Sequence, residues 1–302
     1  MLSRRHFILA GAALPLVPAR LWAHTTLNLG AMQVETLSDG HLVLPLDFAL
    51  GSLSEDEKAD LIARHGLPDA QFDSPCNLTL LRDGGRVVLF DAGSGPDFMP
   101  TAGKIVEALD AVGLAPEDVT HVVLTHGHPD HIWGLLDDFD EPLFAGAEHL
   151  IGRAEFDYWM DPATLESIAE DRQSFVVGAV RRLEALEGRL ALIEDGDEVV
   201  PGVTARLLPG HTPGHMGFRI GTGTETVMVV GDAIANPHLA FEQPARPVSS
   251  DDDPGMAAQT RAALMAELAD SGMPLIGYHL PGGGLGRVER MGDAYRFKEG
   301  LA

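Results

Sequence analysis

The stretch HGHPDH at residues 126–131 places four possible metal ligands within six positions, directly after the apolar run VVL at 122–124. The apolar run predicts a buried strand. Gly127 and Pro129 disfavour a regular helix beyond it, so we expect the ligands on a loop at the end of that strand. Imidazoles and carboxylates are the ligands that Zn²⁺ and similar hydrolytic metals take. A metal-free, histidine-rich loop is the alternative, and the density of ligands argues against it.

Further candidate ligands lie where three later apolar runs end. His211 follows the strand-like segment VTARLL at 203–208, inside PGHTPGH. Asp232 closes TVMVVGD, and His279 follows PLIGY. Glycine or proline turn residues accompany each of them. Six residues on one loop cannot surround two metals, so these positions predict that several strand ends converge on one site.

These motifs together resemble the metallo-β-lactamase superfamily, whose HxHxDH sequence and distant His, Asp and His match this chain. The resemblance implies an α/β protein with a four-layer αββα sandwich. It also implies two divalent metal ions, with zinc expected and manganese, iron or cobalt as alternatives. A bridging carboxylate would let the two ions approach closely, and Asp130 and Asp232 would take part in catalysis. The implied ligands are His126, His128 and His211 for one ion, Asp130, His131 and His279 for the other, and Asp232 for both.

The same resemblance implies a hydrolase in which a hydroxide held between the two metals attacks a carbonyl or phosphoryl centre. THGHPDHIWGLL, GHTPGH, GYHLPGGGLGRVER and the late YRF are similar to the methyl parathion hydrolase-like subgroup. That subgroup predicts small esters, lactones or organophosphate triesters as substrates. The alternatives are a mononuclear iron persulfide dioxygenase, a β-lactamase proper and a metal-binding module without turnover. A β-lactamase proper generally lacks the bridging carboxylate that Asp232 supplies. A glyoxalase-type thiolester hydrolase would carry more cations near its C-terminus.

Other residues are candidates for the surroundings of the site. Asp91 ends the strand-like VVLFD and is expected to orient the ligand loop from behind, with turn capping as the alternative. Trp159 and Phe241 are candidates for aromatic pocket walls, and each could instead belong to the core. His215 is expected to be a strand residue with a satisfied hydrogen bond. Cys76, the single cysteine, is expected to be a buried apolar side chain and not a nucleophile.

Residues 1–23 resemble a twin-arginine signal peptide. The pair Arg4 and Arg5 precedes an apolar segment that prolines interrupt and that is too short to span a bilayer. Cleavage is expected after Ala19 or Ala23. The remaining chain, 24–302, contains no linker-like segment. We therefore expect it to form a single metallo-β-lactamase-fold domain that is periplasmic or secreted.

Capping and turn residues predict several elements. Helices are predicted over 54–66 with Ser54 as N-cap, over 103–113, over 163–187, and from Asp253 to Gly272. A hairpin is predicted to join 76–81 to 86–90. Further strands are predicted at 32–40, 190–193, 203–208, 215–220 and 225–230. Helices on both sides of such β-runs favour a layered α/β arrangement.

The chain is acidic, with 21 Lys and Arg against 45 Asp and Glu and a formal net charge of −24. Removal of residues 1–23 takes away three arginines and no acid, so the net charge becomes −27, with 18 basic and 45 acidic residues. Nucleic acid binding requires Lys and Arg patches, so we expect no nucleic acid partner and no stable membrane association. A small neutral or cationic substrate is favoured, and a homodimer is compatible with the sequence.

Overall fold

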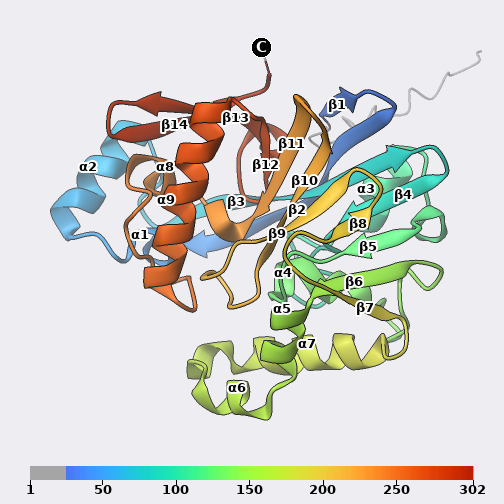
Figure 1. The fold of residues 1–302 in the computed structure, drawn as a ribbon. Coiled ribbons are helices and arrows are strands. Elements are labelled where there is room, and N and C mark those ends of the chain that lie inside the picture. The colour runs from blue at the N-terminus through green and yellow to red at the C-terminus, as the bar shows by residue number, and fades with distance from the viewer. Residues whose placement is uncertain (1–24, 302) are drawn as a thin grey trace, which may run out of the picture.

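The computed structural model describes residues 25–301, so the expected signal peptide lies outside the described residues. Two seven-stranded sheets form its centre (Figure 1), in the strand orders β1-β2-β3-β4-β5-β6-β7 and β14-β13-β12-β11-β10-β9-β8. The first sheet consists of β1 (Thr26–Leu29), β2 (Met32–Pro45), β3 (Gln71–Asp83), β4 (Arg86–Phe90), β5 (His121–Val123), β6 (Glu148–Gly152) and β7 (Leu190–Ile193). The second consists of β8 (Glu198–Val200), β9 (Val203–Leu207), β10 (Met216–Thr222), β11 (Glu225–Gly231), β12 (Leu275–Gly277), β13 (Leu285–Met291) and β14 (Ala294–Glu299).

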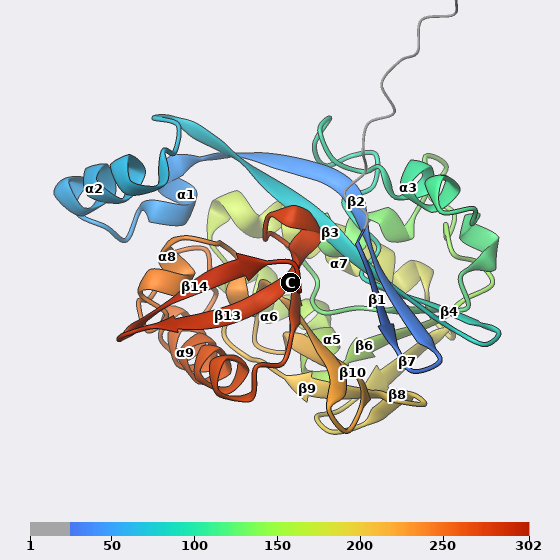
Figure 2. The same cartoon turned by 90° about the horizontal axis from the view of Figure 1, so that it is seen from above.

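Helices cover the outer faces of the two sheets. Figure 2 shows α9 and α3 on opposite sides of the stacked sheets. The helices are α1 (Leu46–Leu50), α2 (Glu55–His65), α3 (Ile105–Ala111), α4 (Pro129–Ile132), α5 (Arg153–Met160), α6 (Pro162–Ser167), α7 (Gln173–Ala185), α8 (Leu239–Glu242) and α9 (Pro254–Ser271). Within the described range, no helix is long and apolar enough to cross a membrane.

Alternate side chains of the central strands point into different layers, as the two-residue period of a strand requires. In β4, Phe90 lies between the sheets, whereas Leu89 packs on the side of α3 and α7. In β11, Val229 lies between the sheets and Met228 packs on the side of α9. The rings of Phe90 and Phe218 meet between the sheets, with centroids 5.3 Å apart. The predicted four-layer αββα sandwich is therefore confirmed.

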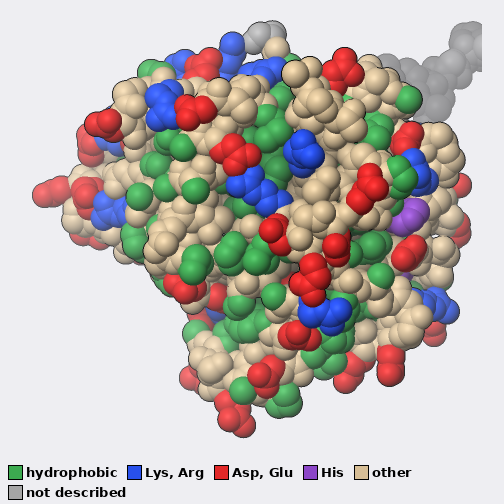
Figure 3. All heavy atoms as spheres, in the orientation of Figure 1, with side chains coloured by type: hydrophobic (Ala, Val, Ile, Leu, Met, Phe, Trp, Pro, Cys, Tyr) green, Lys and Arg blue, Asp and Glu red, His purple; other side chains and the backbone are tan. Residues whose placement is uncertain are grey.

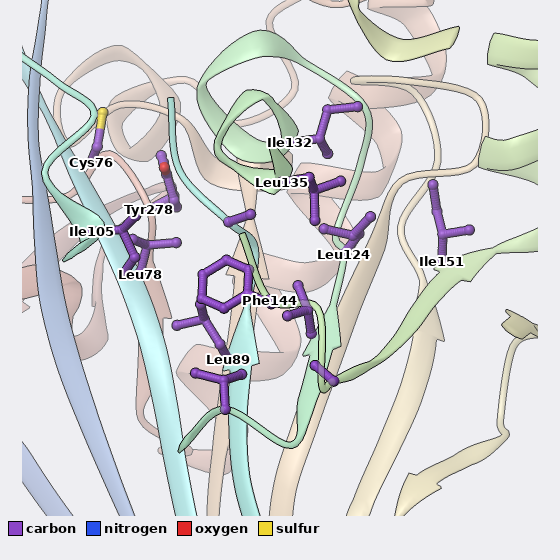
Figure 4. Close-up of a cluster of buried hydrophobic side chains, with 14 of the residues drawn as sticks. Cys76, Leu78, Leu89, Ile105, Leu124, Ile132, Leu135, Phe144, Ile151 and Tyr278 are labelled. Atoms are coloured by element: carbon purple, nitrogen blue, oxygen red, sulfur yellow. The ribbon is translucent and has the colours of Figure 1, made fainter. Parts of the chain in front are cut away.

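The apolar cluster on the helix side of the first sheet contains the single cysteine. Figure 4 shows Cys76 near Tyr278, in the same cluster as Leu89 and Phe144. Cys76 is fully buried and forms no disulfide. Burial raises the pKa of its thiol to about 11, so the thiolate that a nucleophile needs is disfavoured. The prediction of a buried apolar cysteine is confirmed.

Most predicted elements occur where capping and turn residues placed them. Ser54 accepts from the N–H of Glu57 in a capping box, and Gly66 ends α2 with φ +62°. Asp253 caps α9 by accepting from the N–H of Met256. The expected continuous helix over 163–187 is wrong, because Ile168 is extended and separates α6 from α7. That interruption lets Arg172 donate to Asp252 and to two carbonyls of the loop before α9.

A long hairpin carries α1 and α2 away from the sheets. β2 and β3 run far beyond their neighbours, and both views show α1 and α2 at the end of this extension (Figures 1 and 2). We call residues 41–75 the flap. Arg64 and His65 of the flap contact the carboxylate of Glu242 in α8. Arg246 joins Glu57 to the loop after α8. The flap is thereby tied to the second sheet's side of the molecule.

Acidic side chains are spread widely over the surface. On the face seen in Figure 3, Asp and Glu side chains surround smaller groups of Lys and Arg. This distribution agrees with the strongly negative net charge of the chain.

Candidate metal centre

Parallel strand pairs bring the candidate ligands together. β4 and β5 are parallel neighbours in the first sheet, and β11 and β12 are parallel neighbours in the second. The carboxyl ends of parallel neighbours meet at one edge of a sheet. Asp91 after β4 therefore lies beside the loop 126–131, and Asp232 after β11 lies beside His279. The seven residues that converge from both sheets, each at most 7% exposed, are His126, His128, Asp130, His131, His211, Asp232 and His279.

Three imidazoles form the first half of the site. Nδ1 of His128 lies 3.0 Å from Nε2 of His126 and 3.0 Å from Nε2 of His211. Nitrogens bound to a tetrahedral zinc ion at about 2.0–2.1 Å would be about 3.3 Å apart. Burial, followed by the charge of neighbouring imidazoles, holds the pKa values of His126 and His128 well below the usual range. These two rings are therefore neutral, which is the form that binds a metal.

Two carboxylates and two imidazoles form the second half. Nε2 of His279 lies 3.2 Å from an oxygen of Asp130 and 3.2 Å from an oxygen of Asp232. Nε2 of His131 lies 3.5 Å from Asp130 and 3.4 Å from Asp232. Asp232 also lies 3.4 Å from Nε2 of His211 in the first half. Asp232 is thus placed to touch ions in both halves.

Buried atoms without partners support the fit of this site to cations. Nε2 of His131 and Oδ1 of Asp232 are buried and have no hydrogen-bond partner among the described residues. Such an atom costs about 1–3 kcal/mol, and a cation between the two would satisfy both. Burial alone would raise the pKa of Asp232, but the charges of His279 and His131 hold it well below its usual range. The donor set of imidazoles and ionised carboxylates is suited to Zn²⁺, and an imidazole that carries a proton would release it when a cation binds.

Residues behind the ligands fix their orientation. Asp91, with φ +64°, accepts from Nδ1 of His131 at 2.8 Å and from the N–H of Thr125 at 2.7 Å. It therefore contacts the ligand loop from behind, where the sequence placed it. Asp251 pairs with Nδ1 of His211 at 2.9 Å, and its side chain is 2% exposed. Such contacts hold the other ring nitrogen toward a metal. Sequence reasoning missed Asp251, which no motif surrounds.

His215 lies just before β10, fully buried. Its Nε2 accepts the N–H of Asp232 at 3.0 Å, which fixes the backbone of Asp232. The expected hydrogen bond of His215 is therefore present, but the residue lies just outside the strand, and its Nδ1 has no partner among the described residues.

Glu155 is a second residue that sequence reasoning missed. It is fully buried in α5 and accepts from four donors, which are the N–H groups of Gly127 and Gly214, the Thr212 hydroxyl and the Trp159 indole. Burial raises the pKa of Glu155. Because these donors lie on both ligand loops, Glu155 joins the loop 126–131 to the loop that carries His211.

The structure corrects the two predicted pocket walls. Trp159 is fully buried beneath the ligand loop, where a Cβ on Gly127 would lie 2.2 Å from its indole nitrogen. Phe241 is 1% exposed and packs with α9 and β11 side chains. Neither residue lines the cavity at the site. Both are core residues. Gly127 has no side chain and so leaves room for the Trp159 indole, and Phe241 in α8 packs among core side chains.

A mainly apolar cavity of about 260 Å³ opens over the ligands, and we call it the first cavity. His128, Asp130, His211, Asp232 and His279 form its floor. Its apolar walls include Leu42, Leu44, Phe72, Phe98, Met99 and Phe175. The flap therefore supplies one wall, and the segments around α3 and α7 supply the opposite one.

Solved structures share the fold. AidC, a dizinc quorum-quenching lactonase solved with the product N-hexnoyl-L-homoserine, superposes with a TM-score of 0.86 at 24% identity, covering 92% of this chain and 98% of that chain. The hydrolase AbOPH, assigned to the beta lactamase superfamily, gives a TM-score of 0.84 at 24% identity with the same coverage.

Sequence relatives point the same way. An N-acyl homoserine lactonase of Bacillus cereus is 32% identical over 119 residues, 39% of this chain and 40% of that protein, so the match spans less than half of the relative. Metallo-beta-lactamase domain-containing protein 1 of Xenopus laevis is 31% identical over 209 residues, 67% of this chain and 71% of that protein. The family model described as Metallo-beta-lactamase superfamily matches residues 72–273. The chain belongs to the metallo-β-lactamase superfamily.

Proposed function

We propose that the protein is a dinuclear metal-dependent hydrolase of small esters, lactones or organophosphate triesters, in the methyl parathion hydrolase-like subgroup. One observation carries the proposal. Seven buried ligand side chains from both sheets face one another at 3.0–3.5 Å, in two clusters that share Asp232.

Each half of the site would hold one divalent cation. His126, His128 and His211 would hold the first, Asp130, His131 and His279 the second, and Asp232 would contact both. When bound, two such cations would lower the pKa of a water molecule toward neutrality and polarise a carbonyl or phosphoryl oxygen. The two carboxylates offset only half of the +4 charge, so the pair would remain electrophilic.

The rest of the chain supports hydrolysis without a protein nucleophile. The Cys76 thiol is buried and protonated at neutral pH. The guanidinium of Arg172, on the cavity wall, donates to Asp252 and to two carbonyls. Arg261 donates to Asp251 and to two carbonyls. Because the guanidinium groups of Arg172 and Arg261 are already paired, the cavity favours a neutral substrate over an anionic one.

Lactones are the first substrates to test, since an N-acyl homoserine lactonase is among the sequence relatives. The test is hydrolysis of a γ-lactone, p-nitrophenyl acetate and paraoxon by metal-analysed protein spanning residues 24–302. We expect turnover of at least one and close to two metal ions per chain. One iron per chain with oxygen uptake would contradict the proposal, and so would the absence of all hydrolysis.

Asp232→Ala provides the decisive variant. It removes the carboxylate that both clusters share, so turnover should disappear and metal content should fall. Asp293→Ala is the matched control, because Asp293 is exposed in the turn between β13 and β14. An unchanged rate in Asp232→Ala would refute the assignment.

The place of action follows from the N-terminal motif and is part of the proposal. Export by the twin-arginine route would carry a folded, metal-loaded enzyme to the periplasm or beyond. Replacement of Arg4 and Arg5 by Lys should retain the protein inside the cell, which fractionation of expressing cells would reveal.

A further inference from the structure

A second cavity adjoins the first. It has a volume of about 790 Å³ and is lined by Val43, Leu67, Pro68, Gln71, Asp73 and Glu299, among others. Six residues line both cavities where these meet, and we call this set the wall. They are Ala49, Phe72, Ser74, Ala235, Asn236 and His279.

The wall stands at the reacting centre. His279 is a candidate ligand of the second ion and lines both cavities. The other candidate ligands at the cavity surface, including Asp130 and Asp232, line only the first. A group bound against Asp130, Asp232 and His279 in the first cavity would thus lie beside the place where the second cavity meets the first.

The wall is held on both sides. Oδ1 of Asn236 accepts from the N–H of His238 at 2.9 Å and of Ala240 at 3.5 Å, which fixes the amide at the start of α8. Nδ1 of His279 lies 2.7 Å from the carbonyl oxygen of Pro75, at the base of the flap. The contacts of Arg64 and His65 with Glu242 tie the flap to α8 beside these residues.

The two cavities differ in chemistry. The first is walled mainly by aliphatic and aromatic side chains, and its two arginines, Arg172 and Arg261, are paired with neighbouring residues. The second presents Gln71, Asp73, His238 and Glu299 beside its apolar residues, and no Lys or Arg is among its lining residues. An apolar group would partition into the first cavity. A polar group without negative charge suits the second.

We propose that the second cavity receives the leaving group, so that the preferred substrate is an ester with an apolar acyl group and an extended, polar, uncharged or cationic alcohol. This inference rests on the proposed hydrolase function. In the reaction, a bond forms between the water oxygen and the carbonyl carbon, and the bond from that carbon to the alcohol oxygen breaks. The proton of the water ends on the alcohol, and no reactant other than water and the ester is needed.

The test compares two hexanoate esters that differ only in the reach of the alcohol. One is the ester of 2-methoxyethanol, and the other is the ester of triethylene glycol monomethyl ether. Both alcohols carry an ether oxygen at the same position, so their intrinsic reactivities match. We expect the wild-type protein to show a higher kcat/KM for the longer ester, and the free longer alcohol to inhibit competitively.

Gln71→Trp fills the second cavity at an exposed position, so the fold should tolerate it. It should lower kcat/KM for the longer ester by about tenfold, weaken inhibition by the longer alcohol, and leave the shorter ester unchanged. Val43→Phe, also confined to the second cavity, should act in the same direction. Met99→Trp fills the first cavity and is the matched control. It should reduce kcat/KM for hexanoate esters relative to acetate esters, without changing the ratio of kcat/KM between the longer and the shorter alcohol.

The outcomes separate this inference from the proposed function. If the wild-type protein hydrolyses both esters, but Gln71→Trp and Val43→Phe leave their ratio unchanged, the leaving-group site is wrong and the hydrolase stands. An equal loss for both esters would also overturn the inference. If the metal-loaded protein hydrolyses no ester, lactone or phosphotriester, both proposals fail.

Discussion

Replacement of Asp251 by Asn should weaken the binding of the first metal ion, the one assigned to His126, His128 and His211, while leaving the fold intact. The Asp251 carboxylate pairs with Nδ1 of His211 at 2.9 Å and lies 3.4 Å from Nη1 of Arg261. The carboxylate therefore fixes the ring so that Nε2 points toward His128, 3.0 Å away. The Asp251 side chain is 2% exposed, so water screens the pairing little.

The size of the effect follows from what each substitution removes. Loss of a partner behind a metal-binding histidine costs about 10–100-fold in affinity. Asn keeps an oxygen that can accept from Nδ1 and loses only the charge, so we expect about tenfold, or about 1.4 kcal/mol. Asp251→Ala removes both and should approach about 100-fold. Arg261 keeps the carbonyl oxygens of Pro244 and Arg246 in either variant, which limits damage to the fold.

Competition with a chelating dye measures the affinity of each ion. Only the affinity for the ion held by His126, His128 and His211 should fall. One of the two binding steps should therefore shift, and the other should not. Asp253→Asn is the matched control two residues away, since Asp253 only caps α9 and Asn is an equally good cap. Identical titrations for Asp251→Asn and the wild-type protein would refute the idea that Asp251 positions His211.

Three further outcomes are expected. Removal of metal by a chelator should lower Tm by about 8–16 °C, because an ion present at about 1,000 times its Kd contributes about 4 kcal/mol; calorimetry with and without added zinc checks this, and an unchanged Tm would argue against a bound ion. Glu155→Gln replaces one carboxylate oxygen, which accepts from buried donors, with an NH₂ group that donates. The free energy of unfolding measured in urea should fall by about 2–4 kcal/mol, whereas the exposed Glu166→Gln should leave it unchanged. Gly127→Ala forces a Cβ to within 2.2 Å of the Trp159 indole and should reduce metal content, whereas Gly146→Ala, with open space around its Cβ, should retain it; equal metal content in the two variants would contradict the steric explanation.

Local signals predicted the elements that local chemistry determines. Ser54, Gly66 and Asp253 define helix ends through contacts within a few residues, and the structure has them there. The helix expected over 163–187 is interrupted at Ile168, and the interruption accompanies a contact of Arg172 with Asp252, 80 residues later in the chain. Such a contact leaves no periodic signal, so a pattern that continues in the sequence is interrupted in space.

The candidate ligands could be predicted because each follows a strand and sits among turn residues. The residues that hold these ligands in place could not be predicted. Asp251 and Glu155 lie in stretches without a motif, and their roles depend on loops that only the folded chain brings near. The prediction that Trp159 lines the pocket was wrong for the same reason. An aromatic ring in EFDYWMD looks equally suited to a pocket and a core, and the absence of a side chain on Gly127 decides for the core.

The site lies where the two sheets meet, so its assembly depends on their docking. His126, His128, Asp130 and His131 follow the first sheet's β5, whereas His211, Asp232 and His279 follow strands of the second. Glu155 crosses the same boundary from α5 to the loop of Thr212. Without cations, buried carboxylates and imidazoles face one another across this boundary with atoms unpartnered, so metal binding contributes to sheet docking as well as to chemistry. Hydrogen exchange should therefore quicken first in the ligand loops when metal is removed, while amides in the centres of β4 and β11 remain protected. Uniform loss of protection throughout both sheets would show that the cations hold the whole fold and not the boundary.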